Sequence, residues 1–216
     1  MDKSATTCLS FEDIMNMEQS KRTNLINSIG GFKSVCLIGT IDKDNNTNLA
    51  IFNSIVHIGA NPPLIGFLVR PNKVERHTLS NILATEYYTI NHINEFIYKQ
   101  AHQTAARYEK EISEFDETHL TPEYKADFKA PFVQESFVQM GVQFKEKITV
   151  ESNHTILLIG EIKIVNYPTN CMENDGFIDL EKAQTITCIG LDSYYKTTKL
   201  ARLSYAKPNT EPTIIQ

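Results

Sequence analysis

The chain lacks the short motifs that mark the commonest nucleotide-binding and hydrolytic enzymes. Its 216 residues contain no GxGxxG, no GxxxxGK(S/T) and no GxSxG. A Rossmann site, a P-loop and a hydrolase nucleophile elbow are therefore not indicated. The six histidines lack HExxH spacing and the four cysteines form no CxxC pair. No local motif encodes a metal centre, although a metal site assembled by folding stays open.

Long apolar runs and an excess of positive charge are also missing. No apolar stretch approaches the roughly 20 residues that a transmembrane helix needs. The N-terminus has no apolar signal-peptide core, and the formal net charge of −5 argues against a broad nucleic-acid surface. We expect a soluble, cytoplasmic protein without nucleic-acid or membrane partners. Cys36 and Cys188 lie in apolar strand-like runs and are expected in its core.

What the chain does contain is the composition of an ordinary globular protein. Hydrophobic residues make up 41% and charged residues 22%, and the length fits a single domain over residues 1–216. Strand-like segments predominate, helical patterns gather in the middle, and there is no regular βαβ alternation. This favours a mainly β protein, an antiparallel Greek-key-like barrel with a helical insertion.

The expected elements follow from periodicity and turn residues. Strands are expected over residues 32–41, 48–58, 64–69, 87–92, 141–150, 155–167 and 185–189. The first two would form a hairpin across the turn at 42–47. Helices are expected from Ser10 to Met17, over 77–85 and 95–100, and from Thr121, with Pro122 in the first turn. Residues 94–130 would form a helical insertion over the barrel, and residues 206–216 a loose tail.

A basic loop follows the apolar run Leu64–Val69 and leads into the helix expected over 77–85. Arg70, Lys73, Arg76 and His77 surround the start of that helix, where Thr78 and Ser80 supply hydroxyls. Backbone N–H groups at a helix start have no partner inside the helix, and the helix dipole favours negative charge there. The loop therefore suits a phosphate group. The alternative is that Thr78 only caps the helix and the basic side chains are solvated.

Several pieces of the chain, in this order and spacing, resemble the flavin reductase-like proteins. The pieces are Asn48-Leu49-Ala50-Ile51-Phe52-Asn53-Ser54, Asn61-Pro62-Pro63-Leu64, Arg76-His77-Thr78-Leu79-Ser80-Asn81-Ile82, Tyr88-Thr89-Ile90-Asn91-His92, Ala101-His102-Gln103-Thr104-Ala105-Ala106, Ser113-Glu114-Phe115 and Gly190-Leu191-Asp192-Ser193-Tyr194-Tyr195. The resemblance covers about residues 30–205. Members of this family are FMN-binding split β-barrels and usually homodimers.

The resemblance implies a set of cofactor-binding residues. The FMN phosphate would lie against Arg70, Arg76, His77, Thr78 and Asn81. The isoalloxazine ring would lie along the strand that carries Asn48, Ala50, Asn53 and Ser54, with the Ser54 hydroxyl near its polar edge. His102, Gln103 and Tyr195 would lie close to the ring. Without the resemblance, residues 48–54 read as an ordinary half-buried strand.

The implied activity is hydride transfer from NAD(P)H to FMN and onward to an acceptor. His102 is the candidate catalytic residue, because an imidazole can orient or protonate a substrate near neutral pH. Two alternatives stay open: a flavin-binding electron carrier or storage protein without NAD(P)H activity, and a barrel that holds a pyridoxal-type phosphate or haem instead of FMN. The implied homodimer would have flavin near its interface. Four apolar residues of the insertion are expected to cover the partner: Phe96, Ile97, Phe115 and Phe128.

Overall fold

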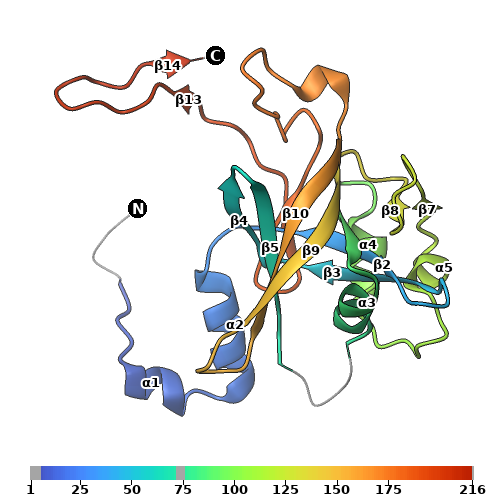
Figure 1. Cartoon of the computed structure of the whole chain (residues 1–216). Coiled ribbons are helices and arrows are strands. Elements are labelled where there is room, and N and C mark those ends of the chain that lie inside the picture. The colour runs from blue at the N-terminus through green and yellow to red at the C-terminus, as the bar shows by residue number, and fades with distance from the viewer. Residues whose placement is uncertain (1–5, 72–75, 216) are drawn as a thin grey trace.

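The structure is a computed structural model that describes residues 6–71 and 76–215. Its main element is a seven-stranded antiparallel sheet that curves into a barrel (Figure 1). The strand order is β3-β2-β6-β9-β10-β5-β4. These strands are β2 (Cys36–Ile41), β3 (Thr47–Phe52), β4 (Ile55–Ala60), β5 (Pro63–Val69), β6 (Tyr87–His92), β9 (Gln139–Thr149) and β10 (Ile156–Asn166). The mainly β class expected from the sequence is confirmed.

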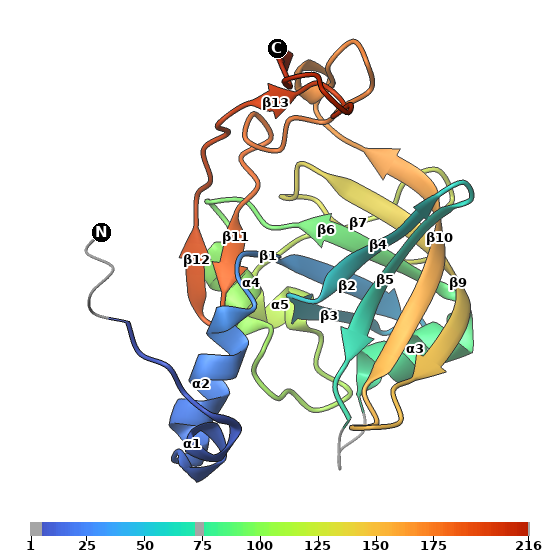
Figure 2. The same cartoon turned by 90° about the vertical axis from the view of Figure 1, so that its left-hand side faces the viewer.

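The remaining elements flank the barrel (Figure 2). The helices are α1 (Phe11–Asn16), α2 (Gln19–Ile29), α3 (His77–Thr85), α4 (Tyr98–Gln103), α5 (Glu114–Thr118) and the 3₁₀ turn η1 (Thr169–Cys171). The short strands are β1 (Lys33–Ser34), β7 (Pro122–Glu123), β8 (Phe132–Val133), β11 (Thr187–Ile189), β12 (Ser193–Tyr195), β13 (Arg202–Leu203) and β14 (Ile214–Ile215). Over the described ranges, no helix is long and apolar enough to cross a membrane.

Strand β2 is covered by the rest of the chain on both of its faces. All six of its residues are buried. Ile38 points into the barrel core with Phe67, Tyr88 and Leu158. Leu37 points to a second core on the other side of the sheet. A strand that is covered on both faces reads as a continuous apolar run, as this one does.

The second core lies under the segment expected as a helical insertion. Ile97 and Phe115 fill it, and each is at most 3% exposed. Phe128 is buried in a third cluster with Phe132. The expectation that these three side chains cover a partner subunit is therefore wrong, because they complete the chain's own cores. Phe96 alone of the four expected residues is exposed, at 63%.

The single strand expected over residues 48–58 is also wrong. The chain breaks at Asn53–Ser54, so that β3 pairs with β2 and β4 pairs with β5 at opposite edges of the sheet. The Ser54 hydroxyl accepts a hydrogen bond from the Leu68 N–H and donates one to the Leu68 carbonyl. This side chain replaces ladder hydrogen bonds at the point where the chain changes partner strand.

The helix expected from Thr121 is a strand. Pro122 begins β7 and pairs with Val133 of β8 in a two-stranded ribbon. Proline has no N–H to donate, which a short edge strand tolerates. The helix expected over 95–100 begins later, at Tyr98, and runs to Gln103. By contrast, α3 (77–85) and β6 (87–92) occupy the expected residues, and α1 begins with the expected capping of Ser10 and Asp13.

The N-terminal helices and the C-terminal hairpin lie outside the barrel and on the same side of it (Figure 1). At the N-terminal end, α1 and α2 include no buried residue in the described part of the chain. At the C-terminal end, the tail expected over 206–216 includes β14, whose Ile214 pairs with Leu203 of β13 in a hairpin.

Candidate functional site

The start of helix α3 has an unusual N-cap residue. This residue, Arg76, has extended backbone, and its side chain makes no capping hydrogen bond. The alternative in which Thr78 caps the helix is wrong, since Thr78 lies inside the first turn. The first N–H groups of an α-helix have no acceptor within the helix itself. That arrangement, with the positive end of the helix dipole, suits an anion.

Two buried hydrogen bonds fix α3 on the barrel. The Asn48 amide in β3 donates to the Thr78 hydroxyl at 3.1 Å, and the Asn81 amide donates to the Thr40 hydroxyl in β2 at 3.1 Å. All four side chains are at most 7% exposed. Net stabilisation by such buried pairs is about 0.5–1.5 kcal/mol each, while an unpaired member costs more. Asn81, which is expected to contact the cofactor, holds the helix against β2.

Positive charge gathers at the same helix start. Arg76 is exposed and His77 is half-buried. Behind His77 lies Glu114 of α5, a buried carboxyl whose oxygen accepts the Leu49 N–H at 2.9 Å. Burial raises the pKa of Glu114, while the Leu49 hydrogen bond and the positive charge of His77 oppose that rise.

Two of the expected basic residues contribute differently. The Arg70 guanidinium donates to the Asn27 side chain of α2 at 2.8 Å, so it links the barrel to the N-terminal helices. Lys73 lies outside the described residues.

A second polar group lies at the far end of β3. The Asn53 amide donates to the Gly190 carbonyl at 2.8 Å, which ties the end of β3 to the turn between β11 and β12. Ser54 uses its hydroxyl on both backbone groups of Leu68, so its proton is already donated within the chain. Ala50 lies between the two ends of β3 and is half-buried.

Helix α4 brings His102 to the same turn. Its Nδ1 lies 2.8 Å from the Tyr194 hydroxyl, and the two rings meet edge to face. Burial, with smaller contributions from Cys188 and Asp192, raises the pKa of Tyr194 to about 12. The phenol therefore stays protonated at neutral pH.

The other two residues expected near the ring have their own partners. Gln103 donates to the Tyr108 hydroxyl at 3.0 Å. Tyr195 is 41% exposed and packs edge-on against Phe32.

Strand β3 thus runs from the Asn48–Thr78 contact at the start of α3 to the Asn53–Gly190 contact at the turn between β11 and β12. Asn48 and Asn53 are five residues apart, about 17 Å along an extended strand. That is the scale of an extended mononucleotide. Comparisons with known proteins identify the family. A family model described as "Flavin reductase like domain" matches residues 32–180. The chain belongs to the flavin reductase-like domain family.

Individual proteins similar to this chain were also found. A split barrel domain protein of Shewanella frigidimarina NCIMB 400, assigned as a flavin reductase, is 50% identical with a TM-score of 0.90. The match covers 93% of this chain and 100% of that one. Nitrilotriacetate monooxygenase component B from Bacillus cereus shares the fold, with 22% identity, a TM-score of 0.81 and coverage of 92% and 100%. An uncharacterised protein of Aquifex aeolicus (strain VF5) is 26% identical over 74% of this chain and 81% of its own length.

In this flavin reductase-like chain, several of the expected site residues gather in two places and others make contacts within the chain. Asn48 and Thr78 meet at one end of β3, beside Arg76 and His77. Asn53 contacts Gly190 in the β11–β12 turn, and His102 contacts Tyr194 in β12. Arg70, Asn81 and Ser54 make structural contacts. Sequence reasoning did not assign a role to Glu114. The sequence feature that could have revealed Glu114 is its position directly after Ser113, the N-cap residue of α5.

The residues available for metal coordination are scattered. Within residues 6–71 and 76–215, no three His, Cys, Asp or Glu side chains gather as metal ligands would. Cys36 and Cys188 are buried, as expected, and burial raises the pKa of Cys36 to about 12. These two thiols are therefore protonated core residues.

Proposed function

We propose that the chain binds FMN along β3 and acts as an NAD(P)H-dependent flavin oxidoreductase. The observation that carries the proposal is the start of α3, where Arg76, His77 and Thr78 follow one another and the Asn48–Thr78 hydrogen bond fixes the helix to β3. The family match supports flavin as the ligand. A pyridoxal-type phosphate or haem has no comparable support.

The residues at the start of α3 fit a phosphate in number and in chemistry. The Thr78 hydroxyl accepts a hydrogen bond from Asn48, so its own proton remains available for a phosphate oxygen. The Arg76 guanidinium would supply charge-assisted hydrogen bonds. His77 would add charge when protonated, with Glu114 behind it as a counter-charge. A dianionic phosphate is therefore a better match here than a neutral group.

The residues at the other end of β3 fit a planar ring with a polar edge. The strand break at Asn53–Ser54 places backbone groups outside the β2–β3 ladder. The Asn53–Gly190 hydrogen bond fixes the position of that backbone. Ala50 is small enough to let a flat ring approach the strand. When bound, FMN supplies the redox chemistry by accepting a hydride from the nicotinamide.

His102 is the candidate for handling a proton beside the ring. Its Nδ1 is engaged by the Tyr194 hydroxyl, which leaves Nε2 as the second hydrogen-bonding atom of the ring. The Tyr194 contact sets the orientation of the imidazole. We assign His102 the role of orienting or protonating a bound substrate, and Tyr194 the role of positioning it.

We also propose that the protein is a homodimer with the flavin near its interface. The apolar residues expected to cover the partner lie largely in the chain's own cores. Support for the dimer therefore comes from the exposed apolar surfaces at the two chain ends, which are treated below.

Two measurements on the purified protein test the proposal. Adding it to FMN should quench flavin fluorescence at micromolar protein and give a yellow, flavin-containing species. Anaerobic stopped-flow mixing with NADH or NADPH should then bleach the flavin absorbance faster than in a free-FMN control. Absence of quenching would contradict the proposed FMN site. Quenching without accelerated reduction by either nicotinamide would assign a flavin carrier or store instead.

A further inference from the structure

The C-terminal segment leaves the barrel as a separate arm. We define the C-terminal arm as residues 199–215. It contains the hairpin β13–β14, paired through Arg202 with Ile215 and Leu203 with Ile214. Figure 2 shows the arm above the barrel, away from the seven-stranded sheet. An isolated two-stranded hairpin has little stability of its own in water. Its conformation therefore depends on what holds its base and what covers its faces.

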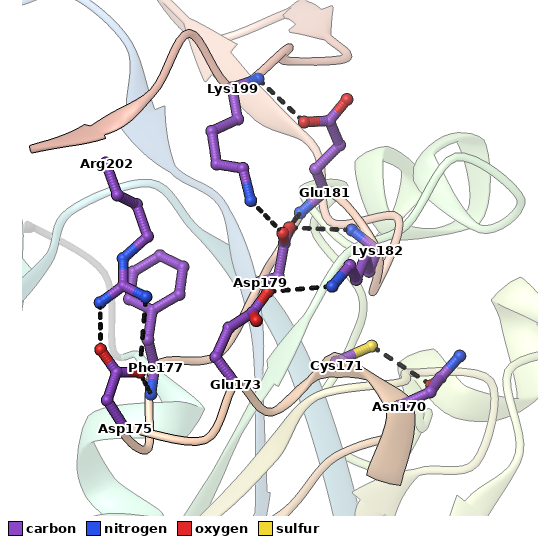
Figure 3. Close-up of polar contacts among 10 residues, drawn as sticks. All are labelled: Asn170, Cys171, Glu173, Asp175, Phe177, Asp179, Glu181, Lys182, Lys199 and Arg202. Carbon is purple, nitrogen blue, oxygen red and sulfur yellow. Dashed lines mark hydrogen bonds and ion pairs between the residues drawn. The ribbon is translucent and has the colours of Figure 1, made fainter. Parts of the chain in front are cut away.

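The first anchor at the base is the carboxylate of Asp179. Lys199 Nζ lies 2.5 Å from it, and the Asp179 side chain is 5% exposed (Figure 3). The same carboxylate accepts the N–H groups of Glu181 and Lys182 at 3.1 and 3.2 Å. The Lys199 N–H donates to the Glu181 carboxylate at 2.8 Å. The hydrogen bond from Lys199 lowers the pKa of Asp179, with the Lys182 N–H assisting, so the anchor is ionised at neutral pH.

The second anchor is Arg202. Its guanidinium contacts both carboxylate oxygens of Asp175, at 3.4 and 2.6 Å, and lies 4.1 Å from the centre of the Phe177 ring (Figure 3). This contact occupies one face of the hairpin. Together the two anchors hold the base of the arm to the segment 175–181.

The opposite face of the hairpin is apolar and uncovered. Because Leu203 pairs with Ile214, these two side chains share a face, and Tyr205 lies two residues beyond Leu203. Their exposed fractions are 59%, 75% and 89%, and Leu200 at the base is fully exposed. Isolated exposed apolar residues are normal on a protein surface, but a contiguous set marks an interaction site.

The same chain carries a second uncovered apolar surface on α1 and α2. Phe11, Met15, Ile26 and Ile29 are between 48% and 71% exposed. A surface helix normally buries one face, yet these two helices include no buried residue among those described. The Arg70–Asn27 hydrogen bond holds α2 beside the barrel. In Figure 1 these helices and the arm project from the same side, at opposite ends of it.

We propose that the apolar face of the C-terminal arm packs against α1–α2 of a second copy of this chain. A two-fold axis that crosses this side of the barrel between the two surfaces brings each arm to the partner's helices. Every contact then occurs twice. Stable interfaces bury about 800 Å² on each partner, and the two-fold symmetry makes each partner contribute both its arm and its helices. The inference rests on the proposed dimer but not on the flavin chemistry.

The test begins with the oligomeric state of the full chain, measured by sedimentation at tens of micromolar. A Leu203→Ser, Tyr205→Ser, Ile214→Ser variant should dimerise about tenfold or more weakly than the wild type. Leu83→Ser with Val165→Ser is the matched control, because it removes exposed apolar side chains elsewhere and should leave dimerisation unchanged. Circular dichroism should show equal folding of all variants, since the arm contributes nothing to the cores.

Cross-linking locates the contact directly. In a Cys8→Ser background, one preparation carries Tyr205→Cys and a second carries Ile29→Cys. Mixing the two under mild oxidation should yield disulfide-linked pairs of one chain of each kind, while neither preparation alone should cross-link to the same extent. A wild-type dimer that survives the arm substitutions and forms no such pairs would overturn the arm contact and leave the dimer standing. A wild-type monomer would overturn both, without affecting FMN binding.

Discussion

A few side chains position the candidate site, and none of them forms a recognisable catalytic motif. The Asn48–Thr78 pair fixes the start of α3, and the Asn53–Gly190 contact fixes the end of β3. Each joins residues at least thirty positions apart in the sequence. Residue types alone cannot reveal such pairs, because Asn and Thr are equally at home in turns. The resemblance predicts ligand contacts for Asn81 and Ser54, and the structure shows that both side chains also have partners within the chain.

Gly39 shows how closely β2 packs against the rest of the chain. A Cβ there would overlap the Pro131 carbonyl oxygen and crowd the Thr89 hydroxyl. Gly39→Ala should therefore lower the free energy of unfolding by about 1–3 kcal/mol, the usual cost of overpacking. Gly59→Ala is the control, since its Cβ would lie 3.6 Å from the nearest atom, the Pro62 oxygen. Urea unfolding measures both variants, and equal losses would contradict the packing argument.

His92, at the end of β6, gives the fold a pH dependence. Burial lowers its pKa to about 4, below the ordinary value near 6.5, so the unfolded chain binds the proton more readily. Stability should therefore fall as pH decreases from 7 to 5, by about 1–2 kcal/mol from this residue. In His92→Gln, the unfolding free energy should fall by about 1–2 kcal/mol less than in the wild type between pH 7 and pH 5. An unchanged slope between pH 7 and pH 5 would show that His92 is solvated.

At the scale of elements, hydrophobic periodicity predicted most of the barrel. Helix α3 and strand β6 occupy the expected residues because a helical apolar pattern and a strand pattern follow each other there. The β3–β4 break was missed, since apolar residues continue on both sides of Asn53–Ser54. Only the pairing with two different strands separates the segments. At Pro122 a helix was predicted where the structure has a strand, because proline suits both a helix start and an edge strand.

The anchoring of the C-terminal arm is itself testable at this scale. Asp179→Asn removes the charge that Lys199 contacts while it retains an acceptor for the Glu181 and Lys182 N–H groups. If the substitution weakens the anchor by about 1–2 kcal/mol, the fraction of molecules with a detached arm should rise about five- to thirtyfold. Trypsin should cut after Lys199 faster by a similar factor. Asp44→Asn, an exposed carboxylate in the β2–β3 turn, should leave the cleavage rate at its wild-type value. A rate unchanged by Asp179→Asn would refute the anchor.

At the scale of the whole molecule, the sequence indicated the barrel but not how the apolar residues are shared between core and surface. Ile97, Phe115 and Phe128 were expected at a subunit interface and instead lie in the chain's own cores. Composition does not distinguish a core apolar residue from an interface one, because both are driven by the same burial of apolar area. The exposed apolar residues at the two chain ends became visible only with the fold in view.

The whole-molecule account places the FMN phosphate at the start of α3, and one comparison tests that placement most directly. Fluorescence titrations with FMN and with riboflavin, at one salt concentration, are made on the wild type, Arg76→Ala and Arg70→Ala. Losing a charge-assisted hydrogen bond of about 1.5–3 kcal/mol should weaken FMN binding of Arg76→Ala roughly ten- to hundredfold. Riboflavin, which has no phosphate, should bind Arg76→Ala as it binds the wild type. Arg70→Ala should leave both affinities unchanged, because Arg70 contacts Asn27. Equal losses for FMN and riboflavin in Arg76→Ala, or no loss for either, would contradict the account.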